Sequence, residues 1–591
     1  MKFLRNVLAT LLGLVIFFGL IVLIFAGIAS SAASDQEVEI ANNSVLKIEL
    51  DQPIVERAKE DPFGTLPLPG ANTGTIGLLG LKEAILEAKA NDNIKGIYLD
   101  AGFTLAGFAT LEEIRNALLD FKESGKFIVA YSEIMTEKAY YLASVADQIY
   151  IHPQGDLEFN GFAITTTFVK ETLEKIGVEP QVFKVGDFKS AVEPFTRNSM
   201  SDSSRLQTQA YLENIYGVYL EGVSESLGKP VSEIRALADS MKARTPALAK
   251  SYGLITDTAY YDMVVQKLGE ALELEADDEG NIDPEEVEFI SLKKYQKSLK
   301  SEADDYSRNR VAVIVAEGNI LPGEGDDNVI GGETFAKEIR KARLDDNIKA
   351  IVLRINSGGG SALASDVMWR ELQLAKKVKP VIASVSDVAA SGGYYMAMAC
   401  DTIVAHPNSI TGSIGVFILF PNFNPLLDKI GIRTEAVGTG EFSSFPSVSE
   451  SLTEAEKDII QNLADRTYED FVSKAAQARG MSFDELEAVA SGRVWSGKEA
   501  MDRDLIDVFG GLEEAIEIAR TQAGLEDDYQ VRYYPRQKTF LEQIMSELDQ
   551  SASAYLMERE LGMAYPYVKK LKEVQQLQGV QARLPFDIEI H

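Results

Sequence analysis

The chain has 591 residues, of which 46% are hydrophobic and 25% charged, a composition that fits a folded globular protein and excludes a disordered one. Its formal net charge is −32 at pH 7, which argues against nucleic acid as a partner because phosphate binding needs clustered lysine and arginine. The single cysteine, Cys400, excludes an internal disulfide, and its apolar neighbours favour a small core residue over a catalytic thiol.

The beginning of the chain differs from the rest. Lys2 and Arg5 precede an apolar run of 23 residues at 7–29, which is long enough for a membrane helix and longer than the apolar region of a signal peptide. Basic residues before the run and acidic residues after it place the N-terminus in the cytoplasm. We therefore expect residues 1–35 to be an uncleaved, single-pass anchor in a bacterial inner membrane, with the remaining chain in the periplasm; cleavage at 30–34 is the alternative.

Two long segments of the chain repeat each other. DNIKGIYLD at 92–100 matches DNIKAIVLR at 346–354, and a Tyr-Tyr pair and a His-Pro pair recur at the same offset of 254 positions. The register holds without a gap over about 100 residues, which chance does not explain. We predict a duplicated domain, with a first repeat at 45–300 and a second repeat at 308–535.

Each repeat alternates strands and helices. In the second repeat, 349–356 and 380–385 are short β-branched runs typical of strands buried on both faces. Between them, 365–378 has helical spacing, with Ser365 as the expected N-cap. This order predicts an α/β fold with parallel strands and crossover helices.

Two further segments flank the second repeat. The carboxylates of the acidic connector at 275–288 lie near the spacing of a calcium loop, but Glu275 replaces the usual first Asp, so a solvated connector is the plainer interpretation. The tail at 536–591 has apolar residues at helical spacing, such as Phe540 and Ile544, and either packs on the domain or mediates assembly.

Histidine is a poor candidate for a catalytic base in this chain. His152 and His406 occupy equivalent positions in the two repeats, each before a proline, which favours a structural role. His591 ends the chain, where side chains are rarely fixed. Neither HExxH nor paired Cys/His spacing occurs, so we predict no metal and no cofactor.

The second repeat carries a serine that the first repeat lacks. Ser391 follows a strand, precedes two glycines and opens a helix, whose N-terminus favours developing negative charge. The backbone N–H of Gly392 is one candidate oxyanion donor, and Gly359, in the glycine-rich turn 356–362, is a second. At the same offset Ser391 aligns with Glu137, so the first repeat lacks the nucleophile; a simple small-residue helix start is the alternative.

The first repeat supplies a candidate base. Lys189 lies among Phe188, Ala191 and Val192, an apolar setting that lowers the pKa of a lysine through desolvation. Its counterpart in the second repeat is Ser443. One repeat therefore has the serine and the other has the lysine, and the two look complementary.

These motifs resemble those of the signal peptide peptidase A family, peptidase family S49, in its long duplicated form. The resemblance covers nearly the whole chain and rests on VGDFKSAVEPF, INSGGGSALASD, ASGGYYMA and HPNSITGSIGVF. It implies tandem domains with a fold similar to Clp protease and crotonase, and a membrane-anchored homotetramer. It also implies the site residues, which are the nucleophile Ser391, the general base Lys189, the lysine-orienting Ser413, and the oxyanion-hole glycines Gly359 and Gly392.

The resemblance further implies a serine protease with a Ser-Lys dyad that degrades signal peptide fragments left in the membrane after secretion. One departure is that the family often has Ser-Pro-Gly-Gly where this chain has Ser-Gly-Gly-Gly at 357–360, and the missing proline makes this loop more flexible. Two alternatives stay open: a crotonase-like acyl-CoA enzyme, which would not require Lys189, and a non-catalytic membrane scaffold of the same fold.

Overall fold

The computed structural model describes residues 39–58, 74–299, 308–325, 329–536 and 579–584, together with Ile590 and eight single positions between 5 and 19. Within these residues, no helix is both long enough and apolar enough to cross a membrane. Most of the predicted anchor at 1–35 lies outside them, as does most of the predicted helical tail.

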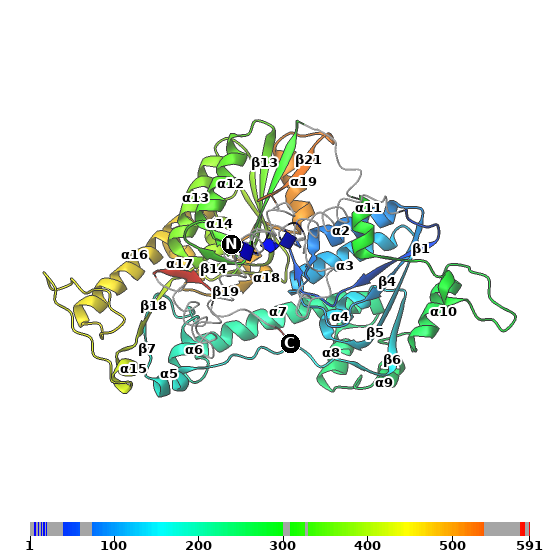
Figure 1. The fold of residues 1–591 in the computed structure, drawn as a ribbon, viewed down its shortest axis with the longest axis horizontal. Coiled ribbons are helices and arrows are strands. Elements are labelled where there is room, and N and C mark those ends of the chain that lie inside the picture. Colours follow the sequence, from blue (N-terminus) through cyan, green and yellow to red (C-terminus); the bar gives the residue numbers. More distant parts are fainter. Residues whose placement is uncertain are drawn as a thin grey trace.

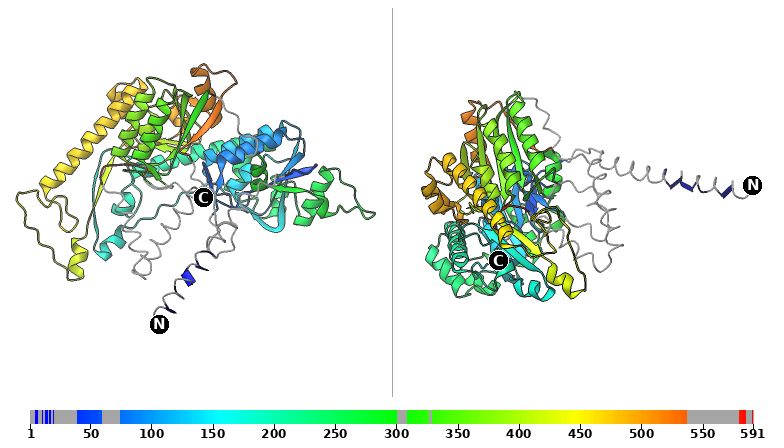
Figure 2. Two further views of the ribbon diagram at one scale, coloured as in Figure 1. Left: turned by 45° about the horizontal axis from the view of Figure 1, so that its top comes forward. Right: turned by 90° about the vertical axis from the view of Figure 1, so that its left-hand side faces the viewer.

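The first repeat forms a parallel sheet that lies beside the sheet of the second repeat (Figure 1 and the left-hand view of Figure 2). Its strand order is β8-β6-β5-β4-β1-β9, and every neighbouring pair is parallel. The strands are β1 (Ser44–Glu49), β4 (Ile94–Asp100), β5 (Phe127–Met135), β6 (Gln148–Leu157), β8 (Asp257–Thr258) and β9 (Phe289–Ser291).

The second repeat forms a sheet of order β19-β17-β15-β13-β10-β21, with β16 beside β15 and β20 beside β16. All pairs are parallel except β17 with β19. The strands are β10 (Arg310–Glu317), β13 (Ile348–Ser357), β15 (Val381–Ala390), β16 (Thr402–Ala405), β17 (Ile410–Gly412), β19 (Val494–Ser496), β20 (Val508–Phe509) and β21 (Gln530–Tyr534).

Helices cover both faces of each sheet. One face of the first sheet packs on α2 (Leu78–Ala90), α3 (Phe108–Lys122) and α4 (Glu137–Ala143), and the other on α10 (Tyr261–Ala271). The second sheet has α12 (Gly332–Leu344), α13 (Ala362–Ala375) and α14 (Gly392–Ala397) on one face and α19 (Leu512–Gln522) on the other. Helices α2 and α12 begin 254 positions apart and end 254 positions apart, which confirms the predicted duplication.

The remaining described elements connect these layers. Two helices are long, α7 (Asp202–Leu227) and α16 (Glu454–Arg479). In Figure 1, α7 lies lengthwise below the two sheets and α16 lies on the left-hand side of the molecule. The shorter elements are β2 (Ile54–Val55), β3 (Ile76–Gly77), α5 (Lys170–Ile176), α6 (Glu193–Thr196), α8 (Val231–Asp239), α9 (Pro246–Ser251), η1 (Pro284–Glu286), α11 (Leu292–Leu299), α15 (Asn424–Lys429), α17 (Phe483–Val489) and α18 (Gly497–Met501).

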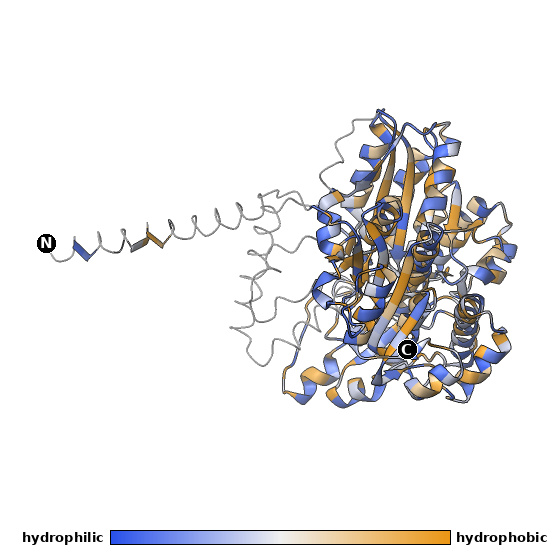
Figure 3. Ribbon diagram, turned by 90° about the vertical axis from the view of Figure 1, so that its right-hand side faces the viewer, coloured by the Kyte–Doolittle hydropathy of each residue, from blue (hydrophilic) through white to orange (hydrophobic). Residues whose placement is uncertain are grey.

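The central strands of the second sheet, β13 and β15, are buried on both faces, as predicted. In β13, Ile351, Leu353 and Ile355 join the core shared with α12 and α13, whereas Ala350 and Val352 join the core shared with α19. Figure 3 shows hydrophobic strands at the centre and hydrophilic residues on the outer helices. Double-sided burial is what parallel sheets between helical layers require.

Helix α13 begins earlier than predicted. Its N-cap is Ser361, whose Oγ accepts from the N–H of Ala364 at 3.3 Å. The predicted cap, Ser365, lies inside the helix and donates from its Oγ to the carbonyl of Ser361 at 2.9 Å. The prediction was wrong because the one large apolar residue of the first turn, Leu363, is exposed, so the apolar periodicity does not mark the start of the helix.

A third sheet combines strands from both repeats and the C-terminal tail. Its order is β12-β11-β14-β22-β18-β7. The pairs β12-β11 and β11-β14 are parallel, and the pairs β14-β22, β22-β18 and β18-β7 are antiparallel. The strands are β7 (Glu179–Lys184), β11 (Asn319–Leu321), β12 (Val329–Gly331), β14 (Gly359–Ser361), β18 (Phe417–Asn422) and β22 (Gln581–Arg583). In the tail, residues 581–583 thus form a strand, whereas the apolar residues at helical spacing, such as Phe540 and Ile544, lie outside the described residues.

A buried ionic cluster joins the two repeats. Arg354, on β13, donates from Nε to Glu56 at 2.9 Å and pairs through Nη2 with Glu113 at 2.7 Å, and all three side chains are buried. Glu113 also lies 2.5 Å from Lys82 and 3.4 Å from Nε2 of His406. Burial alone would raise the pKa of the Glu113 carboxyl, but Arg354 and Lys82 hold it well below its usual range.

Two smaller predictions concern Cys400 and the acidic connector. Cys400 is buried and unpaired. In the connector, Asp277 accepts from the N–H groups of Glu279 and Asn281 at 2.9 Å and 2.8 Å. Across the described part of the chain, no group of three or more His, Cys, Asp or Glu lies together as a possible metal site.

Candidate active site

Ser391 lies between β15 and α14, at the N-terminal end of the helix. Its φ is +54°, in the left-handed region that non-glycine residues rarely adopt, so its backbone is strained. Its N–H donates to the carbonyl of Gly412 at 2.8 Å, and its own carbonyl accepts from the N–H of Tyr395 at 2.8 Å. The side chain makes no capping bond to α14. This turn holds the hydroxyl at the junction of the strand and the helix.

Lys189 reaches Ser391 from the first repeat. It lies on the loop between β7 and α6, which the antiparallel pairing of β7 with β18 brings against the second repeat. The N–H of Phe188 donates to the carbonyl of Ser491 at 3.1 Å. Gly492 packs so closely that a Cβ there would lie 2.7 Å from the Cβ of Lys189. The structure therefore brings together Lys189 and Ser391, the two residues that the comparison of the repeats predicted to be complementary.

The amine of Lys189 is surrounded by serine oxygens. Its Nζ lies 2.8 Å from Ser391 Oγ, 3.0 Å from Ser413 Oγ and 3.1 Å from the carbonyl of Ser413. All three side chains are fully buried. Desolvation lowers the pKa of Lys189 well below its usual range. A neutral amine that donates its two hydrogens to Ser413 keeps its lone pair for the hydroxyl of Ser391.

Ser413 follows β17 and also has a positive φ, of +50°. Its N–H donates to the carbonyl of Arg493 at 2.6 Å, which anchors the strained residue. This conformation turns both the carbonyl and the hydroxyl of Ser413 toward Lys189, so a single residue fixes the position of the amine.

The two glycines predicted as oxyanion donors lie against each other. A Cβ on Gly359, whose φ is +97°, would lie 2.6 Å from the backbone nitrogen of Gly392. Only glycine fits there, both for its conformation and for this approach. The N–H of Gly359 donates to Ser357 Oγ at 3.1 Å, and that hydroxyl donates to the carbonyl of Gly318 at 2.7 Å.

The first repeat has no equivalent pair. Glu137, at the position of Ser391, accepts through Oε1 from the N–H groups of Asn160 and Gly161 at 2.9 Å and 2.8 Å. Burial raises the pKa of Glu137 to about 7. Ser443, at the position of Lys189, is exposed. A carboxyl group thus stands at the position of Ser391 and accepts from the nearby backbone N–H groups.

Sequence reasoning missed Gln207, which lies on α7 and is buried. Its Nε2 donates to the carbonyl of Phe188 at 3.1 Å and to Ser190 Oγ at 2.9 Å, on both sides of Lys189. Its Oε1 accepts from the N–H of Val494, in the second repeat, at 3.1 Å. No local motif marks a glutamine in the second turn of a long helix, so only the tertiary contacts identify it.

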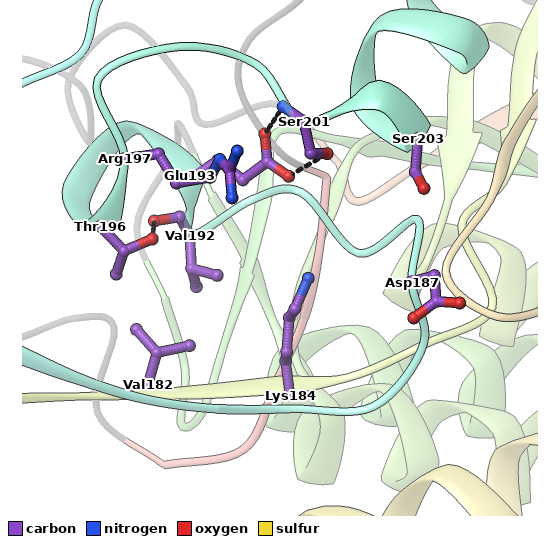
Figure 4. A pocket seen from close by; sticks show the side chains of 9 residues that line it. All are labelled: Val182, Lys184, Asp187, Val192, Glu193, Thr196, Arg197, Ser201 and Ser203. Carbon is purple, nitrogen blue, oxygen red and sulfur yellow. Dashed lines mark hydrogen bonds between the residues drawn. The ribbon is translucent and has the colours of Figure 1, made fainter.

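A pocket of about 420 Å³ lies beside the lysine loop (Figure 4). It is lined from β7 by Val182 and Lys184, and from the loop by Asp187. At its rim Glu193 accepts from the N–H of Ser201 at 3.0 Å. Neither Lys189 nor Ser391 lines this pocket, so it neighbours the site without being part of it.

The model of the family described as "Peptidase family S49" matches residues 120–275 and 373–526, one segment in each repeat. The chain belongs to peptidase family S49. Protease 4 of Haemophilus influenzae is 31% identical to it over 95% of this chain and 93% of its own length. For Protease 4 of Salmonella typhi the identity is 34%, over 92% of this chain and 88% of its own length.

The chloroplastic serine protease SPPA of Arabidopsis thaliana is 36% identical over 87% of this chain and 74% of its own length. The S49 chain is accordingly a serine protease in the duplicated form. A solved ClpP1 mutant of Listeria monocytogenes is 16% identical over 34% of this chain and 94% of its own, with a TM-score of 0.24. That score is too low to decide the expected fold similarity to Clp protease and crotonase, which stays a prediction.

Proposed function

We propose that this S49 chain is a membrane-anchored serine endopeptidase with Ser391 as nucleophile and Lys189 as general base. The observation that carries the proposal is the 2.8 Å distance between Lys189 Nζ and Ser391 Oγ in a fully buried setting. Because desolvation lowers the pKa of Lys189, the amine is neutral at a pH where an exposed lysine is charged.

The proposed reaction follows from these roles. The lone pair of Lys189 accepts the hydroxyl proton of Ser391 as Oγ attacks the peptide carbonyl carbon. The resulting ammonium group donates a proton to the leaving amine, which releases one fragment and leaves an acyl-enzyme. Lys189, neutral again, takes a proton from water as its oxygen attacks the ester carbonyl carbon. When the bond from that carbon to Oγ breaks, the ammonium group returns the proton to Oγ, which releases the second fragment and regenerates both Ser391 and neutral Lys189.

Three further residues have proposed supporting roles. Ser413 orients the amine of Lys189 through its carbonyl and hydroxyl, 3.1 Å and 3.0 Å away. The N–H groups of Gly392 and Gly359 stabilise the oxyanion of the tetrahedral intermediate. For Gly359 this role requires its N–H to turn away from Ser357 Oγ.

The proposed substrates are signal peptide fragments left in the membrane after secretion. A relative from Enterococcus faecium named "Putative signal peptide peptidase SppA" is 28% identical over 39% of this chain and 69% of its own length. The apolar run at 7–29 is the proposed single-pass anchor in a bacterial inner membrane, with a cytoplasmic N-terminus and periplasmic repeats. Anchoring raises the concentration of membrane-bound substrates near the site. A homotetramer is proposed from the family resemblance.

The other two hypotheses explain the site less well. A crotonase-like acyl-CoA enzyme has no use for Lys189 beside Ser391, and a non-catalytic scaffold gives no reason for a desolvated lysine. Membership of a peptidase family favours the protease over both.

A covalent probe tests the proposed nucleophile. The purified full chain is treated with a fluorophosphonate, and the labelled peptide is identified by mass spectrometry. We expect label on Ser391, and loss of both labelling and peptide hydrolysis in Ser391→Ala. The matched control Ser443→Ala, at an exposed serine, keeps both. Labelling at another residue, or hydrolysis that survives in Ser391→Ala, would refute the assignment.

A further inference from the structure

The described part of the C-terminal tail crosses the candidate active site. Strand β22 lies between β14 and β18 in the third sheet and runs antiparallel to both. It is the red strand beside β14 and β18 in Figure 1. Among the described residues, the strand before it along the chain is β21, which lies at the edge of a different sheet. The tail thus returns to the centre of the molecule.

Backbone pairing holds this segment along the glycine-rich turn. The N–H of Leu584 donates to the carbonyl of Gly358 at 2.7 Å, and the N–H of Ala362 donates to the carbonyl of Val580 at 3.1 Å. Between these two bonds the register pairs Gly360 with Ala582. Such contacts recognise a backbone in extended conformation, in the way that a bound peptide adds a strand to a sheet.

The centre of β22 lies on the two glycines of the proposed oxyanion hole. A Cβ on Gly359 would lie 2.1 Å from the carbonyl oxygen of Ala582, and a Cβ on Gly392 would lie 3.0 Å from the same oxygen. Ala582 itself is fully buried. The tail therefore occupies the place where a peptide carbonyl must enter to meet Ser391.

This occupancy agrees with the burial of the reactive groups. Ser391 and Lys189 are both 0% exposed, so a substrate peptide cannot reach them in this arrangement. Removal of β22 would leave a slot about 10 Å wide between β14 and β18, twice the spacing of neighbouring strands and wide enough for a single extended chain.

We propose that residues 579–584 are a built-in pseudosubstrate. They occupy the peptide-binding slot as an antiparallel strand and must leave before an extended peptide can take their place. The slot selects unfolded segments with a small residue at the position of Ala582, because a larger side chain does not fit there. The inference that displacement of the strand uncovers a catalytic serine rests on the proposed function. The inference that the strand occupies the slot does not depend on it.

Two substitutions in the full chain test the inhibition. Ala582→Arg places a long charged side chain where alanine is fully buried, and it should release the strand. Ala582→Gly is the matched control, which keeps the strand without a clash. We expect Ala582→Arg to raise kcat/KM for an unstructured reporter peptide about ten-fold or more, and Ala582→Gly to stay within about two-fold of the wild type. Equal or lower activity in Ala582→Arg would overturn the proposal.

A second variant guards against local damage at Ala582. Leu584, which follows β22, is buried and packs on Gly358: a Cβ on Gly358 would lie 3.2 Å from Cδ1 of Leu584. Leu584→Lys should therefore release β22 from its C-terminal end. We expect Leu584→Lys to raise kcat/KM for the reporter peptide as Ala582→Arg does.

The mass of the purified wild type is a further control. It must match that of the full chain, because loss of the residues after 582 would show that the segment is cleaved as a substrate, which would contradict its role as an inhibitor.

A binding measurement separates this proposal from the proposed chemistry. A fluorescent synthetic peptide of residues 577–586 is titrated by anisotropy into two inactive full chains, Ser391→Ala and Ser391→Ala with Ala582→Arg. We expect binding at least about ten-fold tighter to the double variant, whose slot is open. Equal binding to both chains would refute the pseudosubstrate. If the peptide binds as expected but no variant hydrolyses peptides, the proposed function fails and the occupied slot stands.

Discussion

Burial, rather than a neighbouring charge, lowers the pKa of Lys189 at the centre of the site. Its amine lies within 3.1 Å of three serine oxygens, and desolvation lowers its pKa. A buried ammonium group has no counter-charge among these contacts, so the neutral form is favoured. A neutral amine 2.8 Å from a hydroxyl is poised to accept its proton.

The first prediction is a pH dependence set by Lys189. The base acts in its neutral form, so activity should be present above the folded-state pKa of Lys189 and lost as the pH falls through it. Below that pKa, kcat/KM should fall about ten-fold per pH unit. Because the pKa is lowered, this fall should occur well below the pH at which an ordinary lysine titrates. Measured kcat/KM that is flat from acid to alkaline pH would contradict a lysine base.

Among the secondary-structure elements, β7, β18 and α7 bring the two repeats together at the site. Pairing of β7 with β18 carries the lysine loop across, and α7 places Gln207 between that loop and β19. The side chain of Gln207 thus connects residues on both sides of Lys189 to the strand that follows Arg493, the partner of Ser413.

The second prediction is that Gln207 positions the lysine. In Gln207→Ala, kcat should fall about 10–100-fold with a smaller change in KM, because the loop loses its fixed distance to Ser391. Water that enters beside the loosened loop should also raise the pKa of Lys189, so the pH profile should shift to alkaline values. Gln522→Ala, an exposed glutamine on α19, is the control. An unchanged pH profile together with unchanged kcat would show that Gln207 does not position the base.

The sequence predicted local and periodic features well. The offset of 254 positions identified the duplication, and comparison of the repeats identified Ser391 and Lys189, which the structure places 2.8 Å apart. It did not predict the third sheet, because β7, β18 and β22 pair across more than a hundred residues and carry no mutual signal. Strand β22 was the hardest to foresee, since the tail around it has apolar residues at helical spacing.

At the scale of the whole molecule, the proposed active site depends on how the two repeats are held together. Lys189 belongs to the first repeat and Ser391 to the second, so any separation of the repeats separates the proposed base from the proposed nucleophile. The buried cluster of Arg354, Glu56 and Glu113 lies between the repeats. Removing one member leaves uncompensated buried charge, which is strongly destabilising.

The third prediction is that Arg354→Ala lowers the free energy of unfolding by about 3–5 kcal/mol and reduces peptide hydrolysis in parallel. Arg235→Ala is the matched control, because Arg235 pairs with Glu213 at the surface and the two side chains are 43% and 55% exposed. Its loss should cost at most about 1 kcal/mol. Denaturant unfolding measures the free energy of unfolding of both variants. A similarly small loss of this free energy in the two variants would show that the cluster does not hold the repeats together.

The central claim is that a lysine of one repeat activates a serine of the other. The most direct measurement is the rate at which a fluorophosphonate acylates Ser391 in the wild type, in Lys189→Met and in the control Lys184→Met, a neighbouring lysine on β7. We predict that Lys189→Met slows the acylation about 10²–10⁴-fold, whereas Lys184→Met leaves the rate within about three-fold of the wild type. Acylation of Ser391 at a near wild-type rate in folded Lys189→Met would contradict the claim.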